Sequence, residues 1–183
     1  FVAAVRSPLA SVALFDRDPR ALEILLGIFA ASPHLAEIVI ADPEAWEEVR
    51  VGRGRPEGKP TLAAALAAEV GGSDDLDRVA LAIRRFKRRQ TLRIAYGDVA
   101  ERQRLETVVQ QLSHVADCVV DLAIRAATAH LTRQRGEPRH ADGTPATIAA
   151  LALGKLGGSE LNYSSDIDLV FVHSRSEEHT SEL

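Results

Sequence analysis

The stretch GKLGGSELNYSSDIDLVFVH, residues 154–173, decides the fold because it interrupts an otherwise helical, alanine-rich chain. The apolar run TIAALALG, residues 147–154, leads into it, and the stretch itself ends in the apolar run DIDLVFVH. Short apolar runs with β-branched residues are typical of strands. The pair Gly157–Gly158 between them predicts a turn or the beginning of a short helix.

Two carboxylates in this stretch predict a magnesium site. Asp166 and Asp168 are two residues apart, so on a strand they share one face, while Ile167 and Leu169 point into the core. Crowded carboxylates repel each other, and a divalent cation with hard oxygen ligands such as Mg²⁺ removes that cost. Pairs of such cations serve phosphoryl and nucleotidyl transfer. The preceding glycines allow close approach of a phosphate to the backbone.

Composition limits the remaining classes of function. The chain has 183 residues, of which 46% are hydrophobic and 4% aromatic, and a net charge of −4. An aliphatic core of this kind favours helices, and the charge gives no reason to expect nucleic-acid or membrane binding. The single cysteine, Cys118, excludes an intramolecular disulfide and a cysteine-based zinc site, so a cytoplasmic location is expected. The absence of methionine indicates an internal piece of a longer protein.

Residues 1–135 are expected to be helical. Three Ser-Pro or Asp-Pro pairs, beginning at Asp18, Ser32 and Asp42, predict closely spaced short helices. Two longer apolar stripes predict a helix that begins near Ser73, as its N-cap, and a second helix over residues 102–132. The short polar link between them predicts an antiparallel pair.

The fold class expected is therefore α+β. A linker over residues 136–146, rich in Gly, Pro and charge, separates the helical region from a strand-forming segment over residues 147–174. The last nine residues, 175–183, match the translation of a common sequencing adapter, so we expect this tail to be non-native.

Five basic side chains lie on the first long helix, and two interpretations stay open for them. They are solvated or paired with acids such as Asp77 and Asp98, or they form a positively charged surface that faces a nucleotide or an acidic partner. Nucleic-acid binding is disfavoured because no aromatic residues are interleaved with them. The residues are Arg84, Arg85, Lys87, Arg88 and Arg89.

The pattern strand, Gly-Gly, seven residues, Asp-x-Asp resembles the core of DNA polymerase β-type nucleotidyltransferases. The sequence of this segment, LGKLGGSELNYSSDIDLVF, is similar to that of the glutamine synthetase adenylyltransferase family, also called glutamate–ammonia-ligase adenylyltransferase. Further segments resemble helices of that family: SPHLAEIVIADPE, IRRFKRRQTLRIAYGDVA and LETVVQQLSHVADCVVDLAI. Together these segments cover most of residues 15–173. The resemblance implies that residues 147–174 begin a truncated nucleotidyltransferase core.

Members of the family carry two such domains in tandem, and the segment ELNYSSDIDL resembles the first of these domains. That domain removes AMP from a tyrosine of glutamine synthetase by phosphorolysis, giving ADP, whereas the second attaches AMP from ATP. The resemblance implies that Asp166 and Asp168 are catalytic and bind Mg²⁺. Gly157 and Gly158 would hold nucleotide phosphates, with Ser165 and Lys155 lining the same pocket. It also implies a PII-type nitrogen regulator as a partner.

Such sites use a third carboxylate on a later strand, so the 183 residues alone are expected to be inactive. One alternative is a regulatory or docking module whose degenerate nucleotidyltransferase segment binds only nucleotide or protein. Another is a nucleotidyltransferase of the same superfamily that modifies a nitrogen-signalling regulator.

Overall fold

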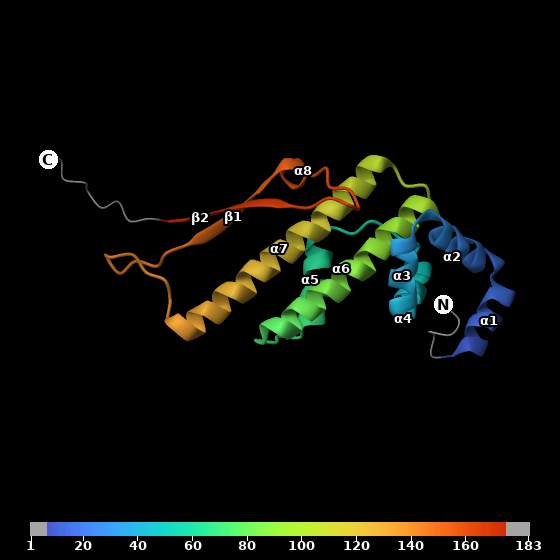
Figure 1. Cartoon of the computed structure of the whole chain (residues 1–183), viewed down its shortest axis with the longest axis horizontal. Coiled ribbons are helices and arrows are strands. Elements are labelled where there is room, and N and C mark those ends of the chain that lie inside the picture. The colour runs from blue at the N-terminus through green and yellow to red at the C-terminus, as the bar shows by residue number, and fades with distance from the viewer. Residues whose placement is uncertain (1–6, 175–183) are drawn as a thin grey trace.

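The computed structural model describes residues 7–174, apart from the side chains of residues 10, 44, 47, 48 and 51. Helices dominate this part of the chain, and two strands follow them (Figure 1). The predicted non-native tail, 175–183, lies outside the described residues. The helices are α1 (Pro8–Arg17), α2 (Pro19–Ala31), α3 (Pro33–Ala41), α4 (Pro43–Gly52), α5 (Lys59–Val70), α6 (Leu76–Val99), α7 (Leu105–Arg135) and α8 (Gly154–Gly157), and the strands are β1 (Ile148–Leu153) and β2 (Asp168–His173).

The three predicted proline starts are confirmed at α2, α3 and α4. In each case the preceding side chain accepts a hydrogen bond from a backbone N–H of the first turn, at 3.3 Å for Asp18, 3.4 Å for Ser32 and 3.3 Å for Asp42. Such caps satisfy donors that the helix itself leaves unpaired. The short helices pack around Trp46, which is 2% exposed and lies 6.0 Å from the ring of Tyr96 on α6.

Helices α6 and α7 form the predicted antiparallel pair, joined by a short turn, and α5 packs against both. The prediction of Ser73 as the cap of α6 is wrong. The helix begins at Leu76, so Asp75 occupies the cap and accepts from the N–H of Asp77 at 2.9 Å. The Ser73 hydroxyl instead accepts from the N–H of Asp75, at 3.3 Å.

A second core joins the helix pair to the C-terminal segment. Leu62 and Leu66 of α5 are 0% and 1% exposed, and they cluster with apolar residues of α6 and α7. Leu156 of α8 and Leu161 of the following loop belong to the same cluster. The segment that carries the two predicted metal ligands is therefore packed directly on the helices.

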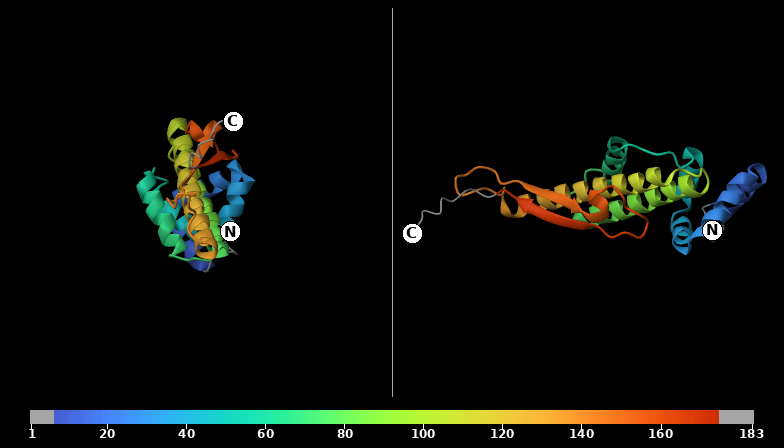
Figure 2. Two further views of the ribbon diagram at one scale, coloured as in Figure 1. Left: turned by 90° about the vertical axis from the view of Figure 1, so that its left-hand side faces the viewer. Right: turned by 90° about the horizontal axis from the view of Figure 1, so that it is seen from above.

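Strands β1 and β2 confirm the α+β class, and they pair antiparallel with Leu153 opposite Asp168 and Ala150 opposite Phe171. Figures 1 and 2 show this hairpin alongside the helix pair, with α1 at the opposite end of the molecule from the 136–147 segment. A two-stranded hairpin is compatible with the start of a nucleotidyltransferase core, which stays a prediction.

Candidate metal and nucleotide site

The hairpin brings the Asp168 carboxylate to the beginning of α8. Leu153, the last residue of β1, pairs with Asp168, the first residue of β2. The chain then turns at Gly154, whose φ of +55° lies in the left-handed region that favours glycine. A Cβ at Gly154 would lie 3.5 Å from Oδ2 of Asp168. The carboxylate and the glycine turn therefore face one another.

Asp166 lies in the loop before β2, so the prediction that both carboxylates sit on one strand face is wrong. Because β1 ends at Leu153 opposite Asp168, no strand residue is left to pair with Asp166. The prediction for the alternate residues holds only in part: Leu169 packs against the second core, whereas Ile167 is 39% exposed. The acidic pair is thus divided between loop and strand.

The two carboxylates fit Mg²⁺ as part of a ligand set. Both Asp166 and Asp168 are exposed, and within residues 7–174 neither side chain has a hydrogen-bond or ion-pair partner. Carboxylate oxygens are the hard ligands that Mg²⁺ prefers. No group of three His, Cys, Asp or Glu side chains able to hold a metal occurs among these described residues. These two acids alone do not complete a metal site.

The two glycines differ in what their surroundings demand. A Cβ at Gly157 would lie 2.6 Å from the carbonyl oxygen of Ala152, so the close approach of α8 to β1 requires glycine there. At Gly158 the nearest atoms would be 3.7 Å away. The short helix begins at Gly154, where the chain turns, so the glycine pair ends this helix and does not begin it. The N–H of Gly158 donates to the carbonyl of Gly154 at 3.1 Å.

Lys155 precedes the loop formed by residues 159–167, here named the 159–167 loop, and Ser165 lies within that loop. Lys155 is an exposed residue of α8. The Ser165 hydroxyl donates to Oδ1 of Asn162 at 2.8 Å and accepts from the Asn162 N–H at 3.1 Å. Ser165 therefore shapes the loop, while Lys155 presents its ammonium group to solvent beside the glycine turn.

Two anchors of this loop were not identified from the sequence. The N–H of Leu161 donates to the hydroxyl of Ser113, 3.2 Å away, and Ser113 on α7 is fully buried. The Tyr163 hydroxyl donates to Oδ2 of Asp98 on α6, at 3.2 Å. Burial, with Asp98 as the second cause, raises the pKa of Tyr163 well above its usual range, so the phenol keeps its proton. A serine within the apolar stripe of α7 was the one available signal.

A second polar network is structural and holds the loop between α4 and α5. Arg93 on α6 is 8% exposed and donates to Oε1 of Gln111 at 2.9 Å and to the carbonyl of Arg55. Gln111 in turn exchanges two hydrogen bonds with the backbone of Glu57, at 2.8 and 2.9 Å. Burial lowers the pKa of Arg93, and each of its three guanidinium nitrogens has a partner, since Nε also donates to Oε1 of Gln90 at 2.6 Å.

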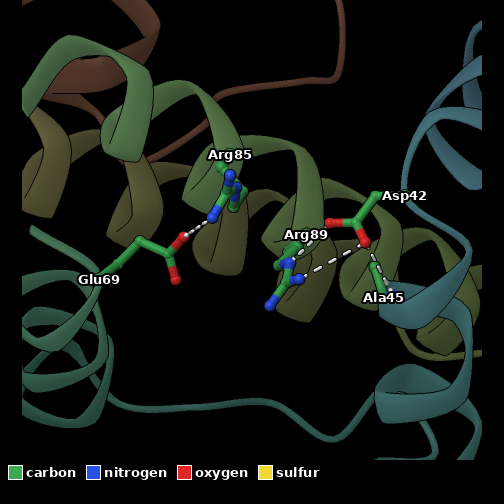
Figure 3. A network of polar contacts seen from close by, with 5 residues as sticks. All are labelled: Asp42, Ala45, Glu69, Arg85 and Arg89. Atoms are coloured by element: carbon green, nitrogen blue, oxygen red, sulfur yellow. Dashed lines mark hydrogen bonds and ion pairs between the residues drawn. The ribbon is translucent and has the colours of Figure 1, made fainter. Parts of the chain in front are cut away.

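The basic run of α6 is partly paired, as Figure 3 shows. Arg85 lies 3.4 Å from Glu69 on α5, and Arg89 lies 2.8 Å from Asp42 at the start of α4. Pairing with acids is therefore confirmed, although the partners are not Asp77 or Asp98. The other members of the run, Arg84, Lys87 and Arg88, are exposed on the helix surface.

Comparison of the amino-acid sequence with known proteins shows which family the chain is similar to. The family model described as glutamate-ammonia ligase adenylyltransferase matches residues 22–182. Proteins named bifunctional glutamine synthetase adenylyltransferase/adenylyl-removing enzyme are similar over most of the chain. The one from Pseudomonas aeruginosa is 35% identical over 180 residues, 94% of this chain. The one from Corynebacterium efficiens is 36% identical over 156 residues, 81% of this chain.

The chain spans only a small part of these relatives, namely 18% of the Pseudomonas aeruginosa protein and 14% of the Corynebacterium efficiens protein. The matched range also runs into the predicted non-native tail, whose origin stays a prediction. Among the helices of residues 7–174, none has the length and apolar character needed to cross a bilayer.

Proposed function

The chain belongs to the glutamate-ammonia ligase adenylyltransferase family, and from this membership we propose that it is part of an enzyme that adenylylates and deadenylylates glutamine synthetase. We assign it to the deadenylylating domain because the segment ELNYSSDIDL, residues 160–169, resembles the first of the two tandem domains. Its substrates would be the AMP-modified tyrosine and phosphate, and its product ADP. A PII-type regulator as partner and a cytoplasmic location belong to the same proposal.

The reaction is a transfer of AMP from tyrosine to phosphate. A phosphate oxygen attacks the phosphorus of the AMP group, the bond from phosphorus to the tyrosine oxygen breaks, and that oxygen takes up a proton. Asp166 and Asp168 would hold Mg²⁺, which when bound neutralises charge on the transferred phosphoryl group. Lys155, exposed on α8, adds positive charge beside the nucleotide phosphates.

One observation carries this proposal: the hairpin brings the carboxylate of Asp168 to the glycine turn. With Oδ2 of Asp168 3.5 Å from the Cβ position of Gly154, a metal on the carboxylate and a phosphate at the turn would be neighbours. At Gly158 the Cβ position lies 3.7 Å from the Glu160 side chain and from the carbonyl oxygen of Gly154, so a phosphate at this glycine would displace the flexible Glu160 side chain.

Activity is expected only when a third carboxylate joins the pair, because residues 7–174 supply no group of three acidic or other metal ligands. Sequencing the source gene across the codon of Ser174 tests whether a third carboxylate is encoded. The proposal expects the frame to continue into further strands that carry another acid. A frame without such an acid would favour the binding-module alternative.

The activity test uses the full-length parent enzyme with phosphate and AMP-modified glutamine synthetase. Asp166→Asn and Asp168→Asn should each lower ADP release at least about a hundredfold, because a ligand of the catalytic metal is lost. Asp121→Asn is the matched control, since Asp121 is an exposed acid of α7 that pairs with Arg125. Full activity in either site variant would overturn the metal assignment.

A further inference from the structure

We propose that Tyr163 is a positioning residue, whose hydroxyl contact with Asp98 fixes the 159–167 loop, and with it Asp166, against the helical region. The consequence for metal binding rests on the proposed function. The contact itself rests on the structure alone, and it joins two residues 65 positions apart in the chain.

The loop is tied to the helix pair at two points. Leu161 is anchored on α7 through the hydroxyl of Ser113, and Tyr163 is anchored on α6 through Asp98. The hydrogen bonds of Ser164 and Ser165 run to Asn162 and stay within the loop. Asp166 follows Tyr163 by three residues, so the Asp98 contact is the anchor nearer to the carboxylate.

Packing alone does not hold the tyrosine. A cavity of about 360 Å³ lies between Tyr163, the α2–α3 junction and α6, with Ser32, His34, Thr91 and Ser164 also on its wall. Tyr163 is 44% exposed, so only part of its ring has neighbours. A side chain beside a cavity loses the dispersion contacts that would otherwise fix it. The hydroxyl contact therefore carries the positioning.

The place of Asp98 supports this role. Asp98 lies in the last turn of α6, which contains no basic residue. A carboxylate at a helix C-terminus opposes the helix dipole, so an acid is unfavourable there unless a donor satisfies it. The Tyr163 hydroxyl is such a donor, since a phenol is protonated at neutral pH, and its raised pKa extends this protonated range to higher pH.

Hydrogen exchange on the whole chain tests the contact. In Tyr163→Phe the amides of residues 159–167 should exchange about three- to tenfold faster, since one hydrogen bond to a carboxylate is lost. Tyr96→Phe deletes the same atom from the buried ring on α6 and should leave these amides unchanged. Asp98→Ala should reproduce the effect, and Asp98→Asn, which keeps an acceptor oxygen, should largely restore protection. Unchanged exchange in Tyr163→Phe overturns the inference.

The Mn²⁺ affinity of the full-length parent enzyme, followed by electron paramagnetic resonance, tests whether the contact positions the metal ligands. Tyr163→Phe should weaken Mn²⁺ binding by a factor similar to that seen in exchange, and Tyr96→Phe should not. If Tyr163→Phe exchanges faster but binds Mn²⁺ with unchanged affinity, the contact between Tyr163 and Asp98 stabilises the loop only, and its positioning role is overturned. If the full-length parent enzyme, which would supply the third carboxylate, binds no Mn²⁺ that depends on Asp166 and Asp168, the proposed metal site fails, whatever the exchange shows.

Discussion

Replacing Gly157 by alanine tests whether this glycine is required by the packing of α8 on β1. The added Cβ would lie 2.6 Å from the carbonyl oxygen of Ala152 and 3.2 Å from its carbonyl carbon. An ordinary contact of this kind begins at about 3.4 Å, so the backbones must separate by about 0.8 Å. Both sides are backbone, and neither can rotate away. Overpacking of this kind costs about 1–3 kcal/mol.

Gly158→Ala is the matched control for that experiment. Gly158 has a φ of −85°, which alanine adopts freely, and its Cβ would have 3.7 Å to the nearest atoms. Its effect on stability should lie between zero and a gain of about 1 kcal/mol, because alanine restricts the unfolded chain. Hydrogen exchange of the β1 and β2 amides reads out both variants. Equal stability of the two variants would refute the packing argument. A loss of nucleotide affinity in Gly158→Ala alone would place the ligand at Gly158.

Three further changes test the helical region and the loop by urea unfolding. Arg93→Ala should cost about 2–4 kcal/mol, because Gln111 and the carbonyl of Arg55 lose a buried donor, and a change below 1 kcal/mol would contradict the network. Asp42→Ala should cost about 1–2 kcal/mol through the lost cap and ion pair, whereas Asp42→Asn keeps the cap and should cost less. The raised pKa of Tyr163 means that the native state holds this proton more tightly than the unfolded state. The contribution of Tyr163 to stability should therefore be full below about pH 10 and be lost above it. Tyr163→Phe should make the loss of stability above this pH less steep, and an unchanged slope would contradict the shift.

Local signals in the sequence were sufficient for the helical part of the fold. The caps of α2, α3 and α4 act within three residues, so Asp-Pro and Ser-Pro pairs predict them directly. The start of α6 was misplaced because Ser73 and Asp75 are both good caps; in the structure Asp75 caps the helix, and Ser73 accepts from the N–H of Asp75. The antiparallel pair followed from two apolar stripes and a short link.

The site depends on contacts that no local pattern contains. Asp166 is off the strand because β1 ends at Leu153, and strand register is a property of both strands together. Glycine is required at position 157 because the carbonyl of Ala152 approaches it closely. The 159–167 loop is held by Asp98, 65 positions from Tyr163, and by Ser113, 48 positions from Leu161. The residue types at the site could be predicted, whereas their anchors could not.

The most direct measurement of the central claim is the location of bound Mn²⁺ by the broadening of backbone amide resonances. The account predicts broadening around Gly154, Gly158 and Asp166–Asp168 that disappears in the Asp166→Asn/Asp168→Asn double variant. The acids next to the start of α6, Asp74, Asp75 and Asp77, serve as the internal comparison, since they are close in sequence but form no metal-binding group in the described part of the structure. Broadening centred on those three acids, unchanged in the double variant, would contradict the assignment of Asp166 and Asp168 as metal ligands.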